Sequence, residues 1–216
     1  MAAKGDSRLN FLLSQAQTAR LDSQLEKASN LLEKALRINS ESISVLMEKG
    51  LLHQQRNQWA AARHCFQSVL LAEPENPQVL NALGHTWQAE GNFNEALKFW
   101  EKAVTIQPDY ADAWQNIGLI QEHLDNLSEA ISAHQRVVKL KPTDGRAHRL
   151  LGMCQLDFGL LTAAGKCFDR ALELDPENPE NRWQRFFIKA LTGNFPSAWA
   201  DYECRFDLPG RNTPDL

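Results

Sequence analysis

The hydrophobic positions of this chain repeat every 34 residues between residues 9 and 212. Each period holds one alanine, and a bulky side chain follows it four residues later. In five periods a small or β-branched residue comes three residues after that. Spacings of four and three residues share one face of an α-helix, so every period predicts a helix that packs through this face. The alanine row is Ala28, Ala62, Ala96, Ala130, Ala164 and Ala198, and the bulky row is Leu32, Phe66, Trp100, His134, Phe168 and Tyr202.

A second helix is predicted in each period, ahead of the alanine. It carries a small residue within it in five periods, at Ala16, Gly50, Gly84, Gly118 and Gly152. Glycine inside a helix costs about 1 kcal/mol, and we expect a closely crossing helix to offset that cost. Prolines end four of the periods, where a missing N–H and a fixed φ stop a helix. They are Pro74, Pro108, Pro142 and Pro176.

These rows together match a known repeat pattern. Residues 79–108, VLNALGHTWQAEGNFNEALKFWEKAVTIQP, resemble the tetratricopeptide repeat, with Leu80, Leu83, Gly84, Trp87, Gly91, Ala96, Trp100, Ala103 and Pro108 at the pattern positions. The resemblance implies an all-α fold: a right-handed superhelical solenoid of six 34-residue helix-turn-helix repeats, whose first helices line a concave groove. The repeats are 9–42, 43–76, 77–110, 111–144, 145–178 and 179–212, between a lead of residues 1–8 and a tail of residues 213–216.

Composition narrows the class of partner. An apolar content of 43% is enough to build a core, and a net charge of −4 gives no basic surface for nucleic acid. The first twenty residues are too polar for a signal peptide, and no run reaches the ~18 apolar residues of a membrane span. We therefore expect a cytoplasmic protein that is not inserted in a membrane. The four cysteines are widely spaced, which favours reduced thiols.

The chain carries no pattern that predicts catalysis. There is no glycine-rich phosphate loop, nucleophile elbow or paired-cysteine metal motif, and the six histidines are scattered. His134 stands in the bulky row, where a core role is expected. The prediction is a non-catalytic scaffold that has no cofactor or metal and binds a protein or peptide partner.

The groove implied by the resemblance would be lined by first-helix residues outside the packing rows. Amide, imidazole and guanidinium groups are common there, and amides both donate and accept hydrogen bonds to an extended peptide. The alternative is a solvated helix face. The five carboxylate-clamp positions known in this family fall on Asn81, His85, Asn116, Arg146 and Leu150, where only the asparagine Asn116 and the cation Arg146 match. The predicted peptide-binding residues are Asn81, His85, Gln88, Gln115, Asn116, Arg146 and Arg149. The groove-facing positions of the repeat before them are Ser44, Met47, Leu51, Gln54 and Gln55.

The last repeat departs from the pattern. In strict register, Arg185 and Lys189 occupy packing positions, and a one-residue shift of the helix instead gives an apolar stripe of Trp183, Phe186, Phe187, Ala190 and Leu191. We expect Trp183, Phe186 and Phe187 to serve docking or self-association as a weak homodimer. The alternative is that Arg205, Asp207 and the tail through Pro209 cover the stripe.

The end of this repeat carries a second resemblance. Residues 193–205 resemble the G-[DN]-[FY]-x-x-[GA]-W-x-x-Y-E-x-R ending of bacterial tetratricopeptide proteins, where a glycosyltransferase domain often follows. Ala198, Cys204 and Phe206 replace residues that are frequent there. The resemblance implies an alternative function, as the partner- or substrate-recruiting arm of a bacterial glycosyltransferase.

Overall fold

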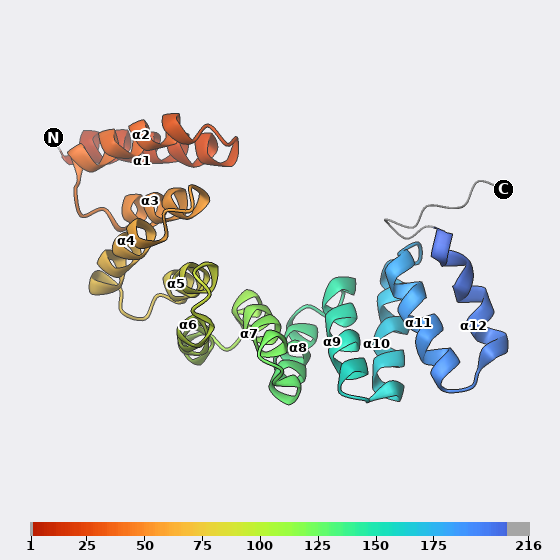
Figure 1. The fold of residues 1–216 in the computed structure, drawn as a ribbon. Coiled ribbons are helices and arrows are strands. Elements are labelled where there is room, and N and C mark those ends of the chain that lie inside the picture. Colours follow the sequence, from red (N-terminus) through yellow and green to blue (C-terminus); the bar gives the residue numbers. More distant parts are fainter. Residues whose placement is uncertain (1, 207–216) are drawn as a thin grey trace. The chain divides into compact units, whose positions relative to one another are not determined.

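The computed structural model describes residues 2–206, which form twelve α-helices and a final 3₁₀ turn, with no strand among them (Figure 1). The predicted all-α fold is therefore confirmed. The first helices of the six hairpins are α1 (Ala2–Leu21), α3 (Ile43–Gln55), α5 (Pro77–Ala89), α7 (Ala111–His123), α9 (Gly145–Asp157) and α11 (Pro179–Leu191). The second helices are α2 (Leu25–Ile38), α4 (Trp59–Ala72), α6 (Phe93–Ile106), α8 (Leu127–Leu140), α10 (Leu161–Leu174) and α12 (Phe195–Tyr202), and η1 spans Glu203–Phe206.

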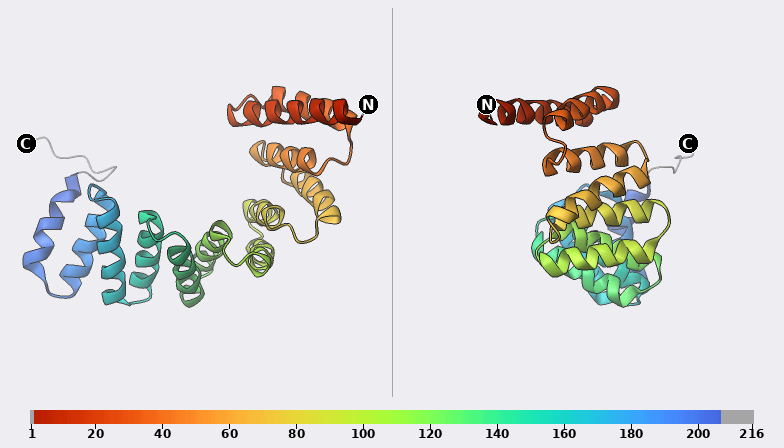
Figure 2. Two further views of the ribbon diagram at one scale, coloured as in Figure 1. Left: turned by 180° about the vertical axis from the view of Figure 1, so that it is seen from behind. Right: turned by 90° about the vertical axis from the view of Figure 1, so that its left-hand side faces the viewer.

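The helices group into two compact units, Met1–Tyr110 and Ala111–Leu216. In the first unit, α1 pairs with α2, α3 with α4 and α5 with α6. In the second unit, α7 pairs with α8, α9 with α10 and α11 with α12. Within each unit the second helix of a hairpin packs on the first helix of the next, as Figures 1 and 2 show. Each unit is thus a stack of three helical hairpins.

The core of each hairpin is built from the repeated rows. All six alanines of the alanine row are at most 2% exposed. The glycines of the first helices face the bulky row, since a Cβ added at Gly50 would lie 2.8 Å from Cδ1 of Phe66. At Gly118 it would lie 2.7 Å from Nδ1 of His134. Two helices can approach this closely only where one of them lacks a side chain, which confirms the expected close crossing.

Each hairpin turns through a residue with positive φ, and these residues also recur every 34 positions. Glycine fills this position in three hairpins, where the left-handed backbone costs no Cβ clash. Short polar residues, which tolerate this conformation better than most, fill it in the other three. The positions are Ser23, Asn57, Gly91, Asp125, Gly159 and Gly193.

The predicted one-residue shift of the last first helix is wrong. Helix α11 begins at Pro179, which is 34 residues after Gly145 at the start of α9. Asn178 holds this start, because its side chain accepts a hydrogen bond from the Asn181 N–H at 3.1 Å, with proline at the first turn. At the other end of the chain, α1 begins at Ala2, inside the segment expected as a lead. Residues Asp207 to Pro209, expected as a possible cover, lie outside the described residues.

Candidate functional site

Three of the predicted groove residues lie on α5 in the first unit. The buried Trp100 ring of α6 orients this helix, since its Nε1–H donates to the Asn81 carbonyl oxygen at 3.1 Å. The His85 ring meets the same indole edge-on, with ring centroids 5.5 Å apart. The core of the hairpin therefore fixes where the half-buried His85 lies.

A depression of about 490 Å³ opens beside His85 in the first unit. Its lining comes from four helices: Arg20 of α1, Leu51, Gln54 and Gln55 of α3, Trp59 of α4, and His85, Gln88 and Ala89 of α5. The Gln54 side chain links α3 to α5 across the depression, because its Nε2 donates a hydrogen bond to the Ala82 carbonyl oxygen at 2.8 Å. The Arg20 side chain pairs with the buried Glu48 carboxylate of α3. The depression thus combines apolar faces with amide, imidazole and guanidinium groups, held by contacts between neighbouring repeats.

Of the predicted residues in this unit, His85 and Gln88 line the depression and Asn81 does not. Arg20 and Trp59 also line the depression but were not predicted from the sequence, because they stand outside the first-helix positions selected for the groove. Trp59 begins α4, just after the turn that follows α3. A large aromatic residue at the entry of a second helix was the signal that could have pointed to it.

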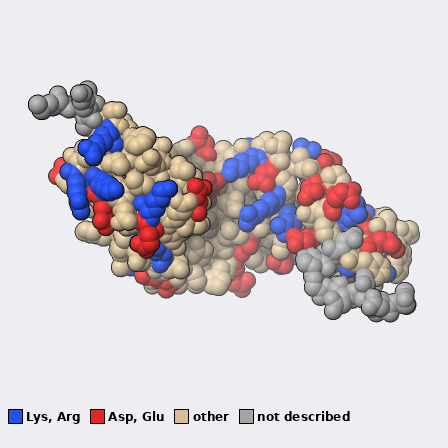
Figure 3. Space-filling view, turned by 90° about the horizontal axis from the view of Figure 1, so that it is seen from above, with Lys and Arg blue, Asp and Glu red and all other residues tan. Residues whose placement is uncertain are grey.

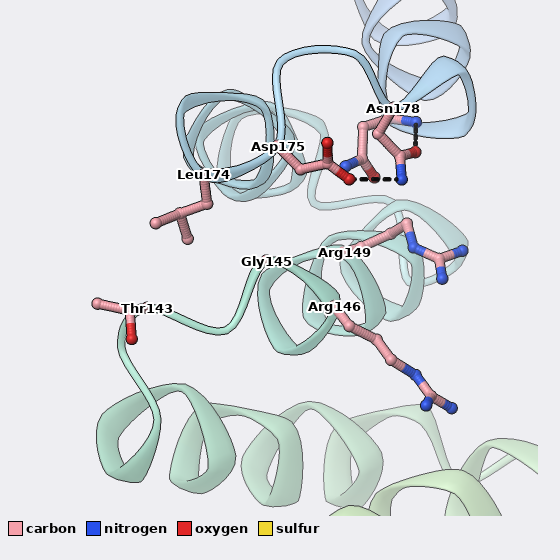
Figure 4. Close-up of a pocket in the computed structure, with 8 residues that line it drawn as sticks. Thr143, Gly145, Arg146, Arg149, Leu174, Asp175 and Asn178 are labelled. Carbon is pink, nitrogen blue, oxygen red and sulfur yellow. Dashed lines mark hydrogen bonds between the residues drawn. The ribbon is translucent and has the colours of Figure 1, made fainter.

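The other four predicted residues lie in the second unit. Gln115 and Asn116 are half-buried on α7, and Arg146 and Arg149 lie on the first two turns of α9. Both arginines line a cavity of about 190 Å³ (Figure 4). Arg149 also pairs with Glu180 of α11, with 2.7 Å between Nη1 and Oε2. This cavity is bordered by the ends of α10 and α11 and contains neither Gln115 nor Asn116 in its lining.

The last hairpin carries a cluster of aromatic rings. Trp183 stacks on Phe186 with centroids 5.3 Å apart and meets Phe187 edge-on at 4.9 Å. The ring centroid of Tyr202 on α12 lies 5.0 Å from that of Phe186. Phe187 is 41% exposed, and Leu191, one turn later, is 64% exposed. Trp199 of α12 is exposed as well, so this hairpin presents a large apolar surface, which we name the C-terminal aromatic surface.

Beneath this surface, Asp201 of α12 is buried and binds two cations of α11. Arg185 Nε donates to Asp201 Oδ2 at 2.8 Å, and Lys189 Nζ donates to the same oxygen at 2.7 Å. Burial by itself raises the pKa of Asp201, but the hydrogen bonds from Arg185 and Lys189 outweigh it and leave the pKa below its usual value. The hydrogen bond to Asp201 in turn raises the pKa of Arg185. The two cations that broke the packing pattern therefore share the Asp201 carboxylate, and Arg185 also pairs with Asp169, with 3.4 Å between Nη1 and Oδ1.

The remaining titratable groups offer little for chemistry. Cys65, Cys154 and Cys167 are free thiols, and burial together with the charges of Glu122 and Asp157 raises the pKa of Cys154 to about 11. His134 is buried and binds Glu122, with 2.7 Å between Nε2 and Oε1. In the described part of the chain, no three His, Cys, Asp or Glu side chains are grouped to hold a metal ion. Across the same residues, no helix has the length and apolar character to cross a membrane.

Charged groups on the surface are mixed in sign. On the face shown in Figure 3, basic and acidic side chains lie close to one another. Some of them pair between neighbouring repeats, such as Arg63 with Glu90 and Arg149 with Glu180, each at 2.7 Å. Pairs that join adjacent hairpins help to set how one repeat sits on the next within a unit.

Three family models match the chain, and each is described as a tetratricopeptide repeat. They match residues 47–111, 88–154 and 146–178. The TPR repeat-containing protein PA4667 of Pseudomonas aeruginosa is 30% identical over 81 residues. That segment is 38% of this chain and 14% of the relative, so the chain matches only a small part of that protein.

Solved structures of similar fold cover most of the chain. The pilF protein of Pseudomonas aeruginosa has a TM-score of 0.81 at 16% identity, over 96% of this chain and 95% of that one. A MamA structure has a TM-score of 0.70 at 21% identity and covers 81% of this chain and 100% of its own. YrrB, described as a TPR protein with an unusual peptide-binding site, has a TM-score of 0.70 at 22% identity, over 82% and 91%. At these identities the likeness shows the fold alone.

Proposed function

Since the chain belongs to the tetratricopeptide repeat proteins, we propose that it is a non-catalytic scaffold that binds an extended peptide segment of a partner protein. One observation carries the proposal: the 490 Å³ depression of the first unit, where four helices bring polar and apolar groups together. The proposal places this activity in the cytoplasm of a bacterium.

The lining of the depression suits an extended peptide better than a ligand that is recognised through one charged group. The amides of Gln55 and Gln88 and the imidazole of His85 can donate and accept hydrogen bonds with peptide backbone. Trp59 and Leu51 offer apolar contact for a side chain. The depression is open, which suits a segment that enters and leaves along the surface. YrrB, with a similar fold and a peptide-binding site of its own, adds support to this function.

A display library of random peptides, selected on the immobilised chain, provides the test. Selected peptides should bind the intact chain in calorimetry. Their affinity should fall about tenfold or more in a His85→Ala/Gln88→Ala variant, because peptide contacts of this kind are worth about 1–3 kcal/mol. Gln67→Ala, an exposed change on α4 outside the depression, is the matched control. Peptides that bind both variants equally well would move the site away from this depression.

We carry a second candidate function, the recruiting arm of a bacterial glycosyltransferase. The ending of residues 193–205 favours it, together with the C-terminal aromatic surface, which could pack on a following domain. Sequencing the gene beyond the codon for Leu216 tests this candidate directly. An open reading frame that encodes a sugar-nucleotide domain supports it, and a stop codon at that point excludes it.

A further inference from the structure

The Arg20 guanidinium in the depression of the first unit is already bound to a carboxylate. Its Nε donates to Oε1 of Glu48, which lies on α3 and is 4% exposed. Among the described residues that line the depression, Arg20 is the only arginine or lysine, and none is an aspartate or glutamate. The one fixed positive charge of the lining is therefore offset by a buried carboxylate that is not itself part of the lining.

The stacking of neighbouring hairpins does not require a charged pair at these positions. One repeat later, Gln54 and Ala82 stand where Arg20 and Glu48 stand, and the Gln54 amide bonds to the Ala82 carbonyl oxygen. An uncharged pair thus links two first helices in the same way. Burying a carboxylate is costly unless it is paired, so Glu48 needs a reason other than stacking. The other repeats also carry uncharged residues at its position: Ser14, Asn116, Leu150 and Gln184.

The pair restricts what can bind in the depression. An acidic group that bound Arg20 would compete with Glu48 and leave a buried carboxylate without its full partner, which is unfavourable. A neutral segment leaves the pair intact. Glu48 is bound through Nε, so the terminal nitrogens of Arg20 can still donate to a peptide carbonyl oxygen. Leu51 and Trp59 provide contact for a large apolar side chain.

We propose that Glu48 is a positioning residue that sets the charge specificity of the depression. By holding Arg20, it makes the site select an uncharged peptide segment with a large apolar side chain and reject acidic segments. This specificity rests on the proposed peptide binding by the first unit. It predicts that loss of the Glu48 charge converts the depression into a site for acidic peptides.

Parallel selections from the random-peptide library test this specificity on four forms of the chain. They are the wild type, Glu48→Gln, Arg20→Gln/Glu48→Gln and Glu26→Gln. Glu48→Gln keeps an acceptor for Arg20 but leaves its charge free to bind an acid, and the double variant has neither charge. Glu26→Gln is the matched control, because it removes the same charge from the pair of Glu26 with Arg56, which lies outside the depression.

Peptides selected on the wild type should carry a large apolar side chain and few acidic residues. Peptides selected on Glu48→Gln should be enriched in aspartate and glutamate, whereas the double variant and the control should select as the wild type does. Calorimetry then compares a wild-type-selected peptide with glutamine or glutamate placed at each position in turn. On Glu48→Gln, glutamate at one position should bind at least about tenfold more tightly than glutamine, because it gains a charge-assisted hydrogen bond. The wild type and the double variant should show no such gain.

A purely structural role for Glu48 gives a different result. Loss of stability alone would weaken the glutamine and glutamate peptides equally, so the ratio of the two affinities separates the roles. If Glu48→Gln does not fold, Glu48→Ala takes its place, since alanine stands at this position in the next repeat. An unchanged ratio in the Glu48 variant, a wild type that prefers glutamate, or an equal gain in Glu26→Gln would each overturn the assigned specificity. Failure of the wild type to select any peptide would instead overturn the proposed function itself.

Discussion

The indole ring of Trp100 lies so close to the backbone of Gly84 that a Cβ at this glycine would be 2.7 Å from the ring atom Cδ1. Trp100 is fully buried, and its Nε1–H is bound to the Asn81 carbonyl oxygen. A displacement of the buried ring would therefore break this hydrogen bond and force it against neighbouring core side chains. The same relation holds between Gly50 and Phe66 and between Gly118 and His134.

Replacing Gly84 by alanine should therefore destabilise the protein. Overpacking of a core typically costs about 1–3 kcal/mol, which exceeds the roughly 1 kcal/mol gained in helix propensity. Urea unfolding followed by circular dichroism measures the difference.

Gly165→Ala is the matched control for this change. Gly165 lies within α10, and its Cβ would lie 3.6 Å from Cγ2 of Ile188, an ordinary contact. This variant should gain about 0.5–1 kcal/mol of stability from helix propensity alone. Stabilisation by both alanines would mean that Trp100 has room to withdraw.

The alanine row gives a second prediction. Ala96 is fully buried on α6, so Ala96→Leu should lower the free energy of unfolding by about 1–3 kcal/mol through overpacking. Glu101→Gln, an exposed change on the same helix, should leave it within about 0.5 kcal/mol. Equal unfolding midpoints for the two variants would contradict the assignment of Ala96 to a helix crossing.

The regular part of the fold could be predicted from the sequence because equivalent positions, 34 residues apart, make the same packing contact in each hairpin. Gly84, Ala96 and Trp100 occupy positions that recur, and a recurring position reveals its role without a structure. The register of α11 could not be predicted in this way. Arg185 and Lys189 break the pattern locally, and the carboxylate that both of them bind, Asp201, lies 16 and 12 residues further along the chain.

Only part of each candidate site followed from the sequence. The 3.6-residue period assigns a face to each helix, which selected His85 and Gln88 on α5. It does not say which other helices border that face, so Arg20 and Trp59 were missed. Glu48 shows a different limit. An acidic residue on this helix face is visible in the sequence, but its burial and its pairing with Arg20 are properties of the folded structure.

The lowered pKa of Asp201 predicts how the stability of the last hairpin depends on pH. A carboxyl with a pKa lowered by folding contributes stability above its unfolded pKa of about 3.9, and loses it as the pH falls through the lower folded value. The side-chain carbon signal of Asp201 should therefore titrate below pH 3.9. Asp201→Asn should destabilise the hairpin by about 1–3 kcal/mol at neutral pH, because Arg185 and Lys189 lose their shared partner. Titration at or above pH 3.9 would show that burial outweighs the two cations.

Cys154 should react slowly with alkylating reagents. Its pKa is about 11 and it is 1% exposed, so at pH 8 only about 0.1% of this thiol is ionised. A short pulse of iodoacetamide followed by peptide mass spectrometry should label it far less in the native protein than in denaturant. Comparable labelling in both conditions would indicate that α9 opens readily.

The C-terminal aromatic surface predicts association of the chain with itself. Burial of apolar area contributes about 25 cal/mol per Å², so a few hundred Å² left in water favours a weak dimer. Trp183 and Phe186 pack on Tyr202 and support the hairpin, which makes them poor sites for a test. Phe187 and Leu191 are better sites, because they lie four residues apart on one face of α11 and are both exposed.

Sedimentation equilibrium can therefore compare the wild type with a Phe187→Gln/Leu191→Gln variant. The wild-type mass should rise with concentration up to hundreds of micromolar, a range typical of weak association, and the mass of the variant should stay at the monomer. Leu71→Gln is the control, since Leu71 on α4 is 87% exposed and lies outside this surface. It should associate as the wild type does. A monomeric wild type at every concentration would contradict self-association, and loss of association in the Leu71 variant would place the contact in the first unit.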